Sequence, residues 1–422
     1  MVTLLSYTDR QILSLLVDPI RHDLDISDTQ VGLLMGTAFA FVYGVAGLPL
    51  GWLADRLCRR NLIVAGIAVW SVGTVCCGWS HNFTQFFAAR LLVGMGEAVL
   101  TPASISMISD SFAPRRRGVA TSVFLMGVAM GAGGAILFGG LILRFVDSGW
   151  LDSTFLDGES PWRVVLLVLG MLGLVPAVLV ASLREPERQH ADAPDTAVPQ
   201  QLTNASSVPG ADNWLRLSPL LLAMGLTSLV DNAVLAWTPS LLTRGFDMAA
   251  SQVGPLLGTL LMIAGGAGML AGGFLSDGAR RKGFRGGRVW VAVCSAALTV
   301  PTTTIIMAGG LNLVLAGITL YVFLSCIGAA VGMLTLLESV PNRRHGLVVA
   351  VAFFLNVALG AGVGPVAVGF AADHLALVGS GIGRAIFLIA CPGFLLVTGL
   401  FSIVLRNASR CERSHSIAPT SA

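Results

Sequence analysis

Four ionisable residues interrupt long apolar stretches of the sequence: Asp9, Arg10, Arg90 and Glu97. A charge at the depth of a lipid bilayer costs at least about 2.5 kcal/mol unless it is paired or hydrated. Arg90 and Glu97 are seven residues apart, so a helix would place both on one face. Two carboxylates and two guanidiniums suit a protonation switch, because neutralising one carboxylate frees an arginine to bind an anion. The alternative is a permanent ion-paired cluster that only positions the helices.

A second group of charges lies where apolar runs end, and it comprises Asp55, Arg56, Arg59, Arg60, Asp110, Asp277, Arg281 and Glu338. These stretches are repeated. Gly51–Arg60 matches Gly273–Lys282 at a separation of 222 residues (277 − 55), and Asp110–Gly118 matches Glu338–Gly346 at 228 (338 − 110). Carboxylates at helix ends can pair with loop cations or helix amino termini when one face of a two-bundle protein is closed. We therefore expect these residues to form a latch on the cytoplasmic face; the alternative is charge that only sets topology.

The composition predicts a membrane protein. Hydrophobic residues make up 55% of the chain and charged residues 12%, well below the roughly 25% of soluble domains. The net charge of +3 is small and does not indicate a nucleic-acid partner. The one lysine, Lys282, precedes glycine, so no phosphate-binding loop is present, and no histidine is followed by glutamate. We expect no enzyme activity, no cofactor and no metal.

Apolar runs long enough to cross a bilayer need about 20 residues. Twelve are predicted, at 2–20, 31–53, 62–80, 85–109, 118–143, 162–183, 217–243, 253–276, 288–308, 311–337, 346–371 and 384–405. The polar stretch 184–216 separates the sixth from the seventh. The predicted fold is all-α, with pseudo-symmetric six-helix bundles over 1–183 and 217–406, a linker over 184–216 and a tail over 407–422.

The positions of the cations predict the orientation. In this topology 19 of the 26 arginines and lysines lie in the linker, the tail or the loops on the same side as both termini. Because such cations mark the cytoplasmic side, we expect both termini and the linker to be cytoplasmic in a cell (inner) membrane protein. For Asp231 and Asn232, within the run 217–243, two interpretations stay open: a polar pair facing a cavity, or residues at the outer end.

Several of these motifs resemble a known family. Gly51–Arg60 and Arg90–Ala98 resemble the loop and helix 4 signatures of the major facilitator superfamily. Within this superfamily, three stretches of the chain are similar to the spinster family of lipid and organic-solute transporters. They are Tyr7–Leu13, Ser27–Leu34, and Gly96–Ala98 continued by Ile108–Phe112. The sequence departs from the loop signature at Cys58, where glycine is usual. Helix 5 also lacks the Gly-Pro signature of drug-proton antiporters.

The resemblance implies a monomeric secondary transporter that works by alternating access. Its implied partners are protons, the bilayer and a small amphipathic or anionic solute, either lysolipid-like or an organic acid. Asp9, Arg10, Arg90 and Glu97 would then bind solute and couple protons. An organic-anion/proton uptake symporter is the first alternative. A drug efflux antiporter and a non-transporting receptor are weaker ones.

Overall fold

The computed structural model describes residues 2–112, 131, 133–148, 160–186, 214–282, 286–307, 309–340, 345–374 and 381–416. Throughout these ranges the regular structure is helical. The first half of the predicted helix over 118–143 lies outside the described residues. Its second half is helical over 133–147.

The amino-terminal bundle begins with a helix that is broken. α1 (Val2–Leu15) stops at a bend at Leu16 and α2 (Val17–Leu24) continues, so the stretch predicted as one span over 2–20 is two shorter helices. The remaining elements are α3 (Asp28–Gly32), η1 (Leu33–Thr37), α4 (Ala38–Arg56), α5 (Arg59–Gly78), α6 (Phe83–Ala98), α7 (Leu100–Ser111), the segment 133–147 and α9 (Pro161–Ala181). The start of α3 is fixed by a capping box between Ser27 and Gln30.

The carboxy-terminal bundle comprises α10 (Trp214–Phe246), α11 (Ala250–Arg281), α12 (Gly287–Ile305), α13 (Leu311–Glu338), α14 (His345–Leu355), η4 (Asn356–Ala361), α15 (Gly362–His374) and α16 (Gly381–Ser416). α16 stays helical to Ser416, past the predicted end of the last span at 405. Ten helices in the described ranges are long and apolar enough to span a membrane. The other two predicted spans are the broken first helix and the partly described fifth.

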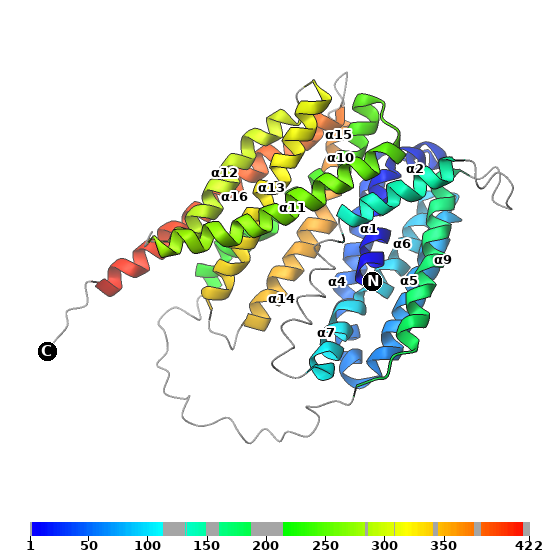
Figure 1. Cartoon of the computed structure of the whole chain (residues 1–422), viewed down its shortest axis with the longest axis horizontal. Helices are drawn as coiled ribbons and strands as arrows, with labels where there is room; N and C mark the ends of the chain where they lie inside the picture. Colours follow the sequence, from blue (N-terminus) through cyan, green and yellow to red (C-terminus); the bar gives the residue numbers. More distant parts are fainter. Residues whose placement is uncertain are drawn as a thin grey trace.

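The two bundles meet at one end and separate toward the other. We call the end near Glu185, where the chain leaves α9, the linker end, and the end near Asp28 and Arg244 the far end. Figure 1 shows the bundles together around α2, α10 and α15 and apart toward α7 and α14. The contacts between bundles run mainly from α1, α3 and η1 to α10, α15 and η4.

The surroundings of glycines along single helices show the same separation of the two bundles. A Cβ at Gly36, in the π-helical segment η1, would overlap the backbone of Ala361 in the π-helical segment η4. A Cβ at Gly51, further along the same span, would meet no described atom within 4 Å. In α11, Gly254 likewise packs directly on Gly140 at the far end, whereas a Cβ at Gly273 would meet no described atom within 4 Å. Small residues thus let the backbones pack closely at the far end.

Candidate functional site

Asp9 of α1 and Arg90 of α6 form a buried ion pair. The Asp9 Oδ2 to Arg90 Nη1 distance is 3.3 Å, and both residues are almost inaccessible. Thr74 of α5 donates a hydrogen bond of 2.6 Å to the other carboxylate oxygen. Arg90 also donates to the backbone oxygen of Leu34 in η1, at 3.4 Å. The pair therefore ties together three transmembrane helices and the π-helical segment.

Arg10 and Glu97 form the second pair, with 2.6 Å between Arg10 Nη2 and Glu97 Oε2. The Arg10 guanidinium also lies over the Phe39 ring, 3.8 Å from its centroid. The Arg10 side chain is 20% exposed, whereas the Glu97 side chain is 1% exposed. Arg10 Nε has no hydrogen-bond partner among the described residues. This pair thus keeps hydrogen-bonding capacity in reserve.

The structure brings all four predicted residues into one cluster. Each carboxylate pairs with an arginine of the other helix, so the cluster holds α1 against α6. Neutralising either carboxylate would leave a buried guanidinium without its counter-charge, and such a charge strongly favours a new anionic partner. Arg10 is the more accessible of the two arginines. The arrangement can therefore exchange a proton on a carboxylate for an anionic group on an arginine.

At the linker end, the predicted latch residues pair within their own bundles. Buried Arg59 contacts Asp110 and lies 2.9 Å from Glu185. In the carboxy-terminal bundle the pairs join Arg280 to Glu338 at 3.1 Å and Arg288 to Asp277 at 3.2 Å. No ion pair among the described residues crosses between the bundles here.

The other latch residues differ in their surroundings. Arg56 stacks on Trp52, with 3.9 Å between the guanidinium carbon and the ring centroid. Arg60 donates from its backbone to Glu185, and Arg281 is exposed. The side chain of Asp55 lies outside the described part of the structure. Whether these residues act as a latch stays a prediction.

Glu185 anchors the start of the linker. Burial alone would raise the pKa of Glu185, but hydrogen bonds from the Arg59 side chain and from the backbone of Arg60 and Arg59 outweigh it and hold the pKa below its usual value. A carboxylate with a lowered pKa stabilises the folded contact above its ordinary pKa and loses that effect as the pH falls through the folded value. The anchor is therefore in place at neutral pH.

At the far end, ion pairs do cross between the bundles, and the sequence did not predict them. Arg244 of α10 contacts Asp18 of α2 and lies 2.9 Å from Asp28 of α3. Asp373 of α15 accepts backbone hydrogen bonds from Asp28 and Thr29, at 3.1 and 2.7 Å. Asp28, Arg244 and Asp373 line a pocket of about 300 Å³. We call Asp18, Asp28, Arg244 and Asp373 the far-end latch.

The structure decides between the two interpretations of Asp231. It lies in the middle of α10, not at its outer end, and accepts hydrogen bonds from Tyr321 (2.9 Å) and Ser325 (2.7 Å) of α13. Neighbouring Asn232 donates instead to the backbone oxygen of Ser228, at 2.9 Å. Both residues are half-buried. Asp231 is thus an interior carboxylate of the carboxy-terminal bundle.

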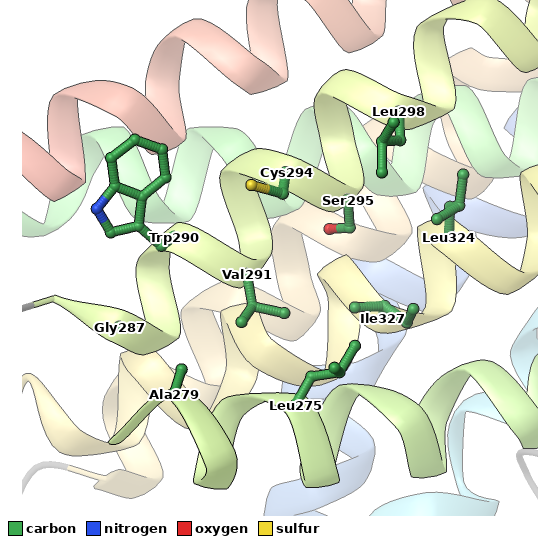
Figure 2. A pocket seen from close by; sticks show the side chains of 10 residues that line it. All are labelled: Leu275, Ala279, Gly287, Trp290, Val291, Cys294, Ser295, Leu298, Leu324 and Ile327. Atoms are coloured by element: carbon green, nitrogen blue, oxygen red, sulfur yellow. The ribbon is translucent and has the colours of Figure 1, made fainter. Parts of the chain in front are cut away.

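A larger groove, of about 530 Å³, lies between α11, α12 and α13 (Figure 2). Its lining is apolar apart from Cys294 and Ser295, and Trp290 and Leu298 on its rim are more than half exposed. The groove offers no counter-charge to an ionic solute. Its composition is that of a surface in contact with lipid chains.

Two helical bundles that surround buried ionic groups, with ion pairs closing one end, define a polytopic membrane transporter. The family comparison agrees: the model of the Major Facilitator Superfamily matches residues 1–286. The chain belongs to the Major Facilitator Superfamily. Its fold and its relatives are those of transporters, not of enzymes.

Relatives over much of the chain transport different solutes. An MFS-type efflux pump of Mycolicibacterium smegmatis is 27% identical, covering 92% of this chain and 87% of that protein. A probable L-galactonate transporter of Escherichia coli is 29% identical over 65% of this chain and 59% of its own length. The sphingosine-1-phosphate transporter SPNS2 of Danio rerio is 24% identical, and the match covers 94% of this chain and 80% of that protein.

A solved structure shares the fold. The crystal structure of a bacterial homolog of the human lysosomal transporter Spinster, in an inward-facing and unoccupied conformation, matches with a TM-score of 0.76. The two sequences are 23% identical, and the match covers 97% of this chain and 93% of that chain. The chain is thus similar in sequence to spinster transporters and shares the fold of a bacterial Spinster homolog.

Proposed function

We propose that the protein is a proton-coupled secondary transporter that moves a small amphipathic or anionic organic solute across the inner membrane by alternating access. The observation that carries this proposal is the pair of buried salt bridges Asp9–Arg90 and Arg10–Glu97. Each offers a carboxylate that can take up a proton and an arginine that can then bind an anionic group. Because the Arg10 side chain is partly exposed, an anionic group can reach it when Glu97 is neutral.

The distribution of ion pairs supports alternating access. The pairs at the far end join the two bundles, whereas the described pairs at the linker end stay within one bundle. A transporter closed at the far end and open at the linker end has this pattern. With the linker in the cytoplasm, this conformation is the inward-facing one.

The nature of the solute follows from the charge of the site. Arginines favour an anionic group, such as a phosphate or a carboxylate. The relatives include a transporter of a phosphorylated lipid and a probable transporter of a sugar acid, and both solutes carry an anionic group. An organic-anion/proton uptake symporter is therefore the main alternative.

The topology provides a first prediction. We expect the termini and the segment 184–216 to be cytoplasmic, because most cations lie on that side in the twelve-helix arrangement. Single cysteines placed in the linker of a cysteine-free protein should react with a membrane-impermeant maleimide only after cells are opened. Labelling of a linker cysteine in intact cells would refute the orientation.

The second prediction concerns the proposed linker-end latch. Replacing Asp55 with Asn should slow transport several-fold and leave solute affinity nearly unchanged, because a latch biases the populations of the two conformations. Transport in proteoliposomes and binding in detergent would be measured on the same preparation, with Asn61→Asp as a control for altered charge on the same face. An equal loss of affinity and rate would place Asp55 in the binding site.

Transport itself is tested by reconstitution. Proteoliposomes with an imposed pH gradient should accumulate lysolipids or sugar acids above the equilibrium concentration, and a protonophore should abolish the accumulation. A receptor would bind the solute without moving it. A uniporter would only equilibrate the solute, whatever the pH gradient.

A further inference from the structure

The apolar groove between α11, α12 and α13 begins at the linker end of the carboxy-terminal bundle. Ala279 and Gly287 line it at that end, and Leu298 lines it at the other (Figure 2). From Gly287 to Leu298 is eleven residues of α12 (298 − 287), or about 16 Å at 1.5 Å per residue. The hydrocarbon core of a bilayer is about 30 Å thick, so one leaflet occupies about 15 Å of it. The groove thus has the length of the acyl chains of a single leaflet.

The groove belongs to the carboxy-terminal bundle alone. All of its lining residues come from α11, α12 and α13, so it is separate from the ionic cluster of the amino-terminal bundle. Leu275, Trp290 and Leu298 in its lining are each more than half exposed. Trp290 lies near the start of α12, and tryptophan is enriched where a membrane-spanning helix meets the headgroups. The groove is therefore open to lipid chains, with its linker end at headgroup depth.

Two exposed cations lie just beyond that end. Leu275, Ala279 and Lys282 follow one another at spacings of four and three residues, so Lys282 continues the face of α11 that lines the groove. Arg281 precedes it, and both cations are exposed. A chain in the groove would thus bring its polar end close to positive charge.

The neighbouring acids are bound by other arginines. Glu338 lies 3.1 Å from Arg280 and also contacts Arg288, and Arg288 lies 3.2 Å from Asp277. These two carboxylates are therefore matched by two arginines. The two cations beyond the groove add a surplus of positive charge to the described residues of this surface.

The internal repeat shows that these cations lack a partner that their counterparts have. Arg281 and Lys282 correspond to Arg59 and Arg60 at the separation of 222 residues. The Arg59 side chain lies 2.9 Å from Glu185, and the backbone of Arg60 donates to the same carboxylate. No described acid forms an ion pair with Arg281 or Lys282. An anion from outside the chain can therefore take the position that Glu185 has in the other half.

We propose that the groove and these two cations bind an anionic phospholipid of the leaflet at the linker end. One acyl chain lies in the groove, and the phosphate lies against Arg281 and Lys282. Basic residues beside a space between membrane-spanning helices are complementary to anionic headgroups. The site goes beyond the proposed transport function and does not depend on it, because this lipid stays bound and is not carried across.

The test compares two lipids that differ only in the headgroup. Dioleoylphosphatidylglycerol and dioleoylphosphatidylcholine would each be titrated onto the purified full-length protein, and bound lipid would be followed by native mass spectrometry. The wild type should bind the anionic lipid about tenfold more tightly, because each cation near the headgroup favours a negative charge. Replacing Arg281 and Lys282 together with Gln should remove this preference. Replacing Arg60 and Arg184 with Gln removes the same charge at the linker end of the other bundle and should preserve it.

A second variant tests the groove itself. Cys294→Trp places a large side chain in the groove at an exposed position, so the packing between helices is not disturbed. It should lower the affinity for both lipids several-fold. Val178→Trp, on the exposed surface of α9, is the matched control and should leave both affinities unchanged.

Trp290 provides a measurement that does not depend on either variant. Bromine atoms on an acyl chain quench tryptophan fluorescence on contact, and the share of Trp290 is the difference between wild type and Trp290→Phe. Brominated phosphatidylglycerol should quench this share more than brominated phosphatidylcholine at equal concentration. If Cys294→Trp does not fold, this measurement decides whether the lipid lies in the groove.

Four results would overturn the proposal. Equal affinity of the wild type for the two lipids would do so, as would an equal loss of preference in both double variants, which would assign it to general surface charge. Unchanged lipid affinity in folded Cys294→Trp would place the lipid elsewhere, and so would equal quenching of Trp290 by the two brominated lipids. None of these measurements involves turnover, so failure of the lipid site leaves the transport proposal standing.

Discussion

Glu97→Gln and Asp9→Asn should each abolish accumulation of solute driven by a pH gradient, while solute binding and pH-insensitive exchange persist. An amide has nearly the shape of a neutral carboxyl group but cannot titrate, so the variant mimics one protonation state permanently. Each carboxylate is buried against an arginine, and losing the negative charge frees that arginine. The measurement is uptake in proteoliposomes with and without a pH gradient.

The controls separate coupling from folding. Asp25→Asn, at an exposed residue with positive φ that asparagine tolerates, should behave as wild type. Arg90→Ala should instead weaken binding of an anionic solute by about 1.5 to 3 kcal/mol, the range for a charged hydrogen bond. Wild-type pH dependence in both amide variants would show that proton coupling does not depend on this cluster.

Arg244→Ala should open the far end of the protein. Arg244 contacts Asp18 and Asp28 across the bundle interface, and the Asp28 side chain is 7% exposed, so its charge would lose a partner in a poorly hydrated place. If these ion pairs stabilise the closed far end by about 1.4 kcal/mol, their loss would shift the ratio of the two conformations about tenfold. A cysteine in place of buried Ile382, which lines the far-end pocket, should then react about tenfold faster with a maleimide.

Arg21→Ala is the matched control for this effect. Arg21 lies in the same pocket, 3.4 Å from Asp28, but its side chain is 46% exposed. An exposed pair stabilises by roughly 0 to 1 kcal/mol, so labelling should change little. Equal labelling rates in wild type and Arg244→Ala would show that the far-end latch does not hold the bundles together.

The buried cluster could be predicted from the sequence because its residue types are costly in a membrane. Asp9, Arg10, Arg90 and Glu97 stand out against apolar neighbours, and only mutual pairing makes them tolerable there. The pairing pattern itself, with Asp9 on Arg90 and Glu97 on Arg10, needed the structure. The sequence separations are compatible with other partners.

The far-end latch could not be predicted in the same way. Arg244 and Asp18 lie near helix ends, where charges are common and carry no penalty that would mark them. Their contact joins residues 226 positions apart and depends on how the two bundles lean together. The break at Leu16 was also missed, since the apolar run continues through it. Asp231 stayed undecided because its depth in the membrane depends on where α10 begins.

The most direct test of the proposed coupling is solute-driven proton movement. Proteoliposomes containing a pH-sensitive dye, without an imposed pH gradient, would receive a gradient of transported solute. We predict a change of internal pH that follows the solute flux in wild type and is absent in Glu97→Gln. Solute flux at the wild-type rate without any proton movement would contradict the account.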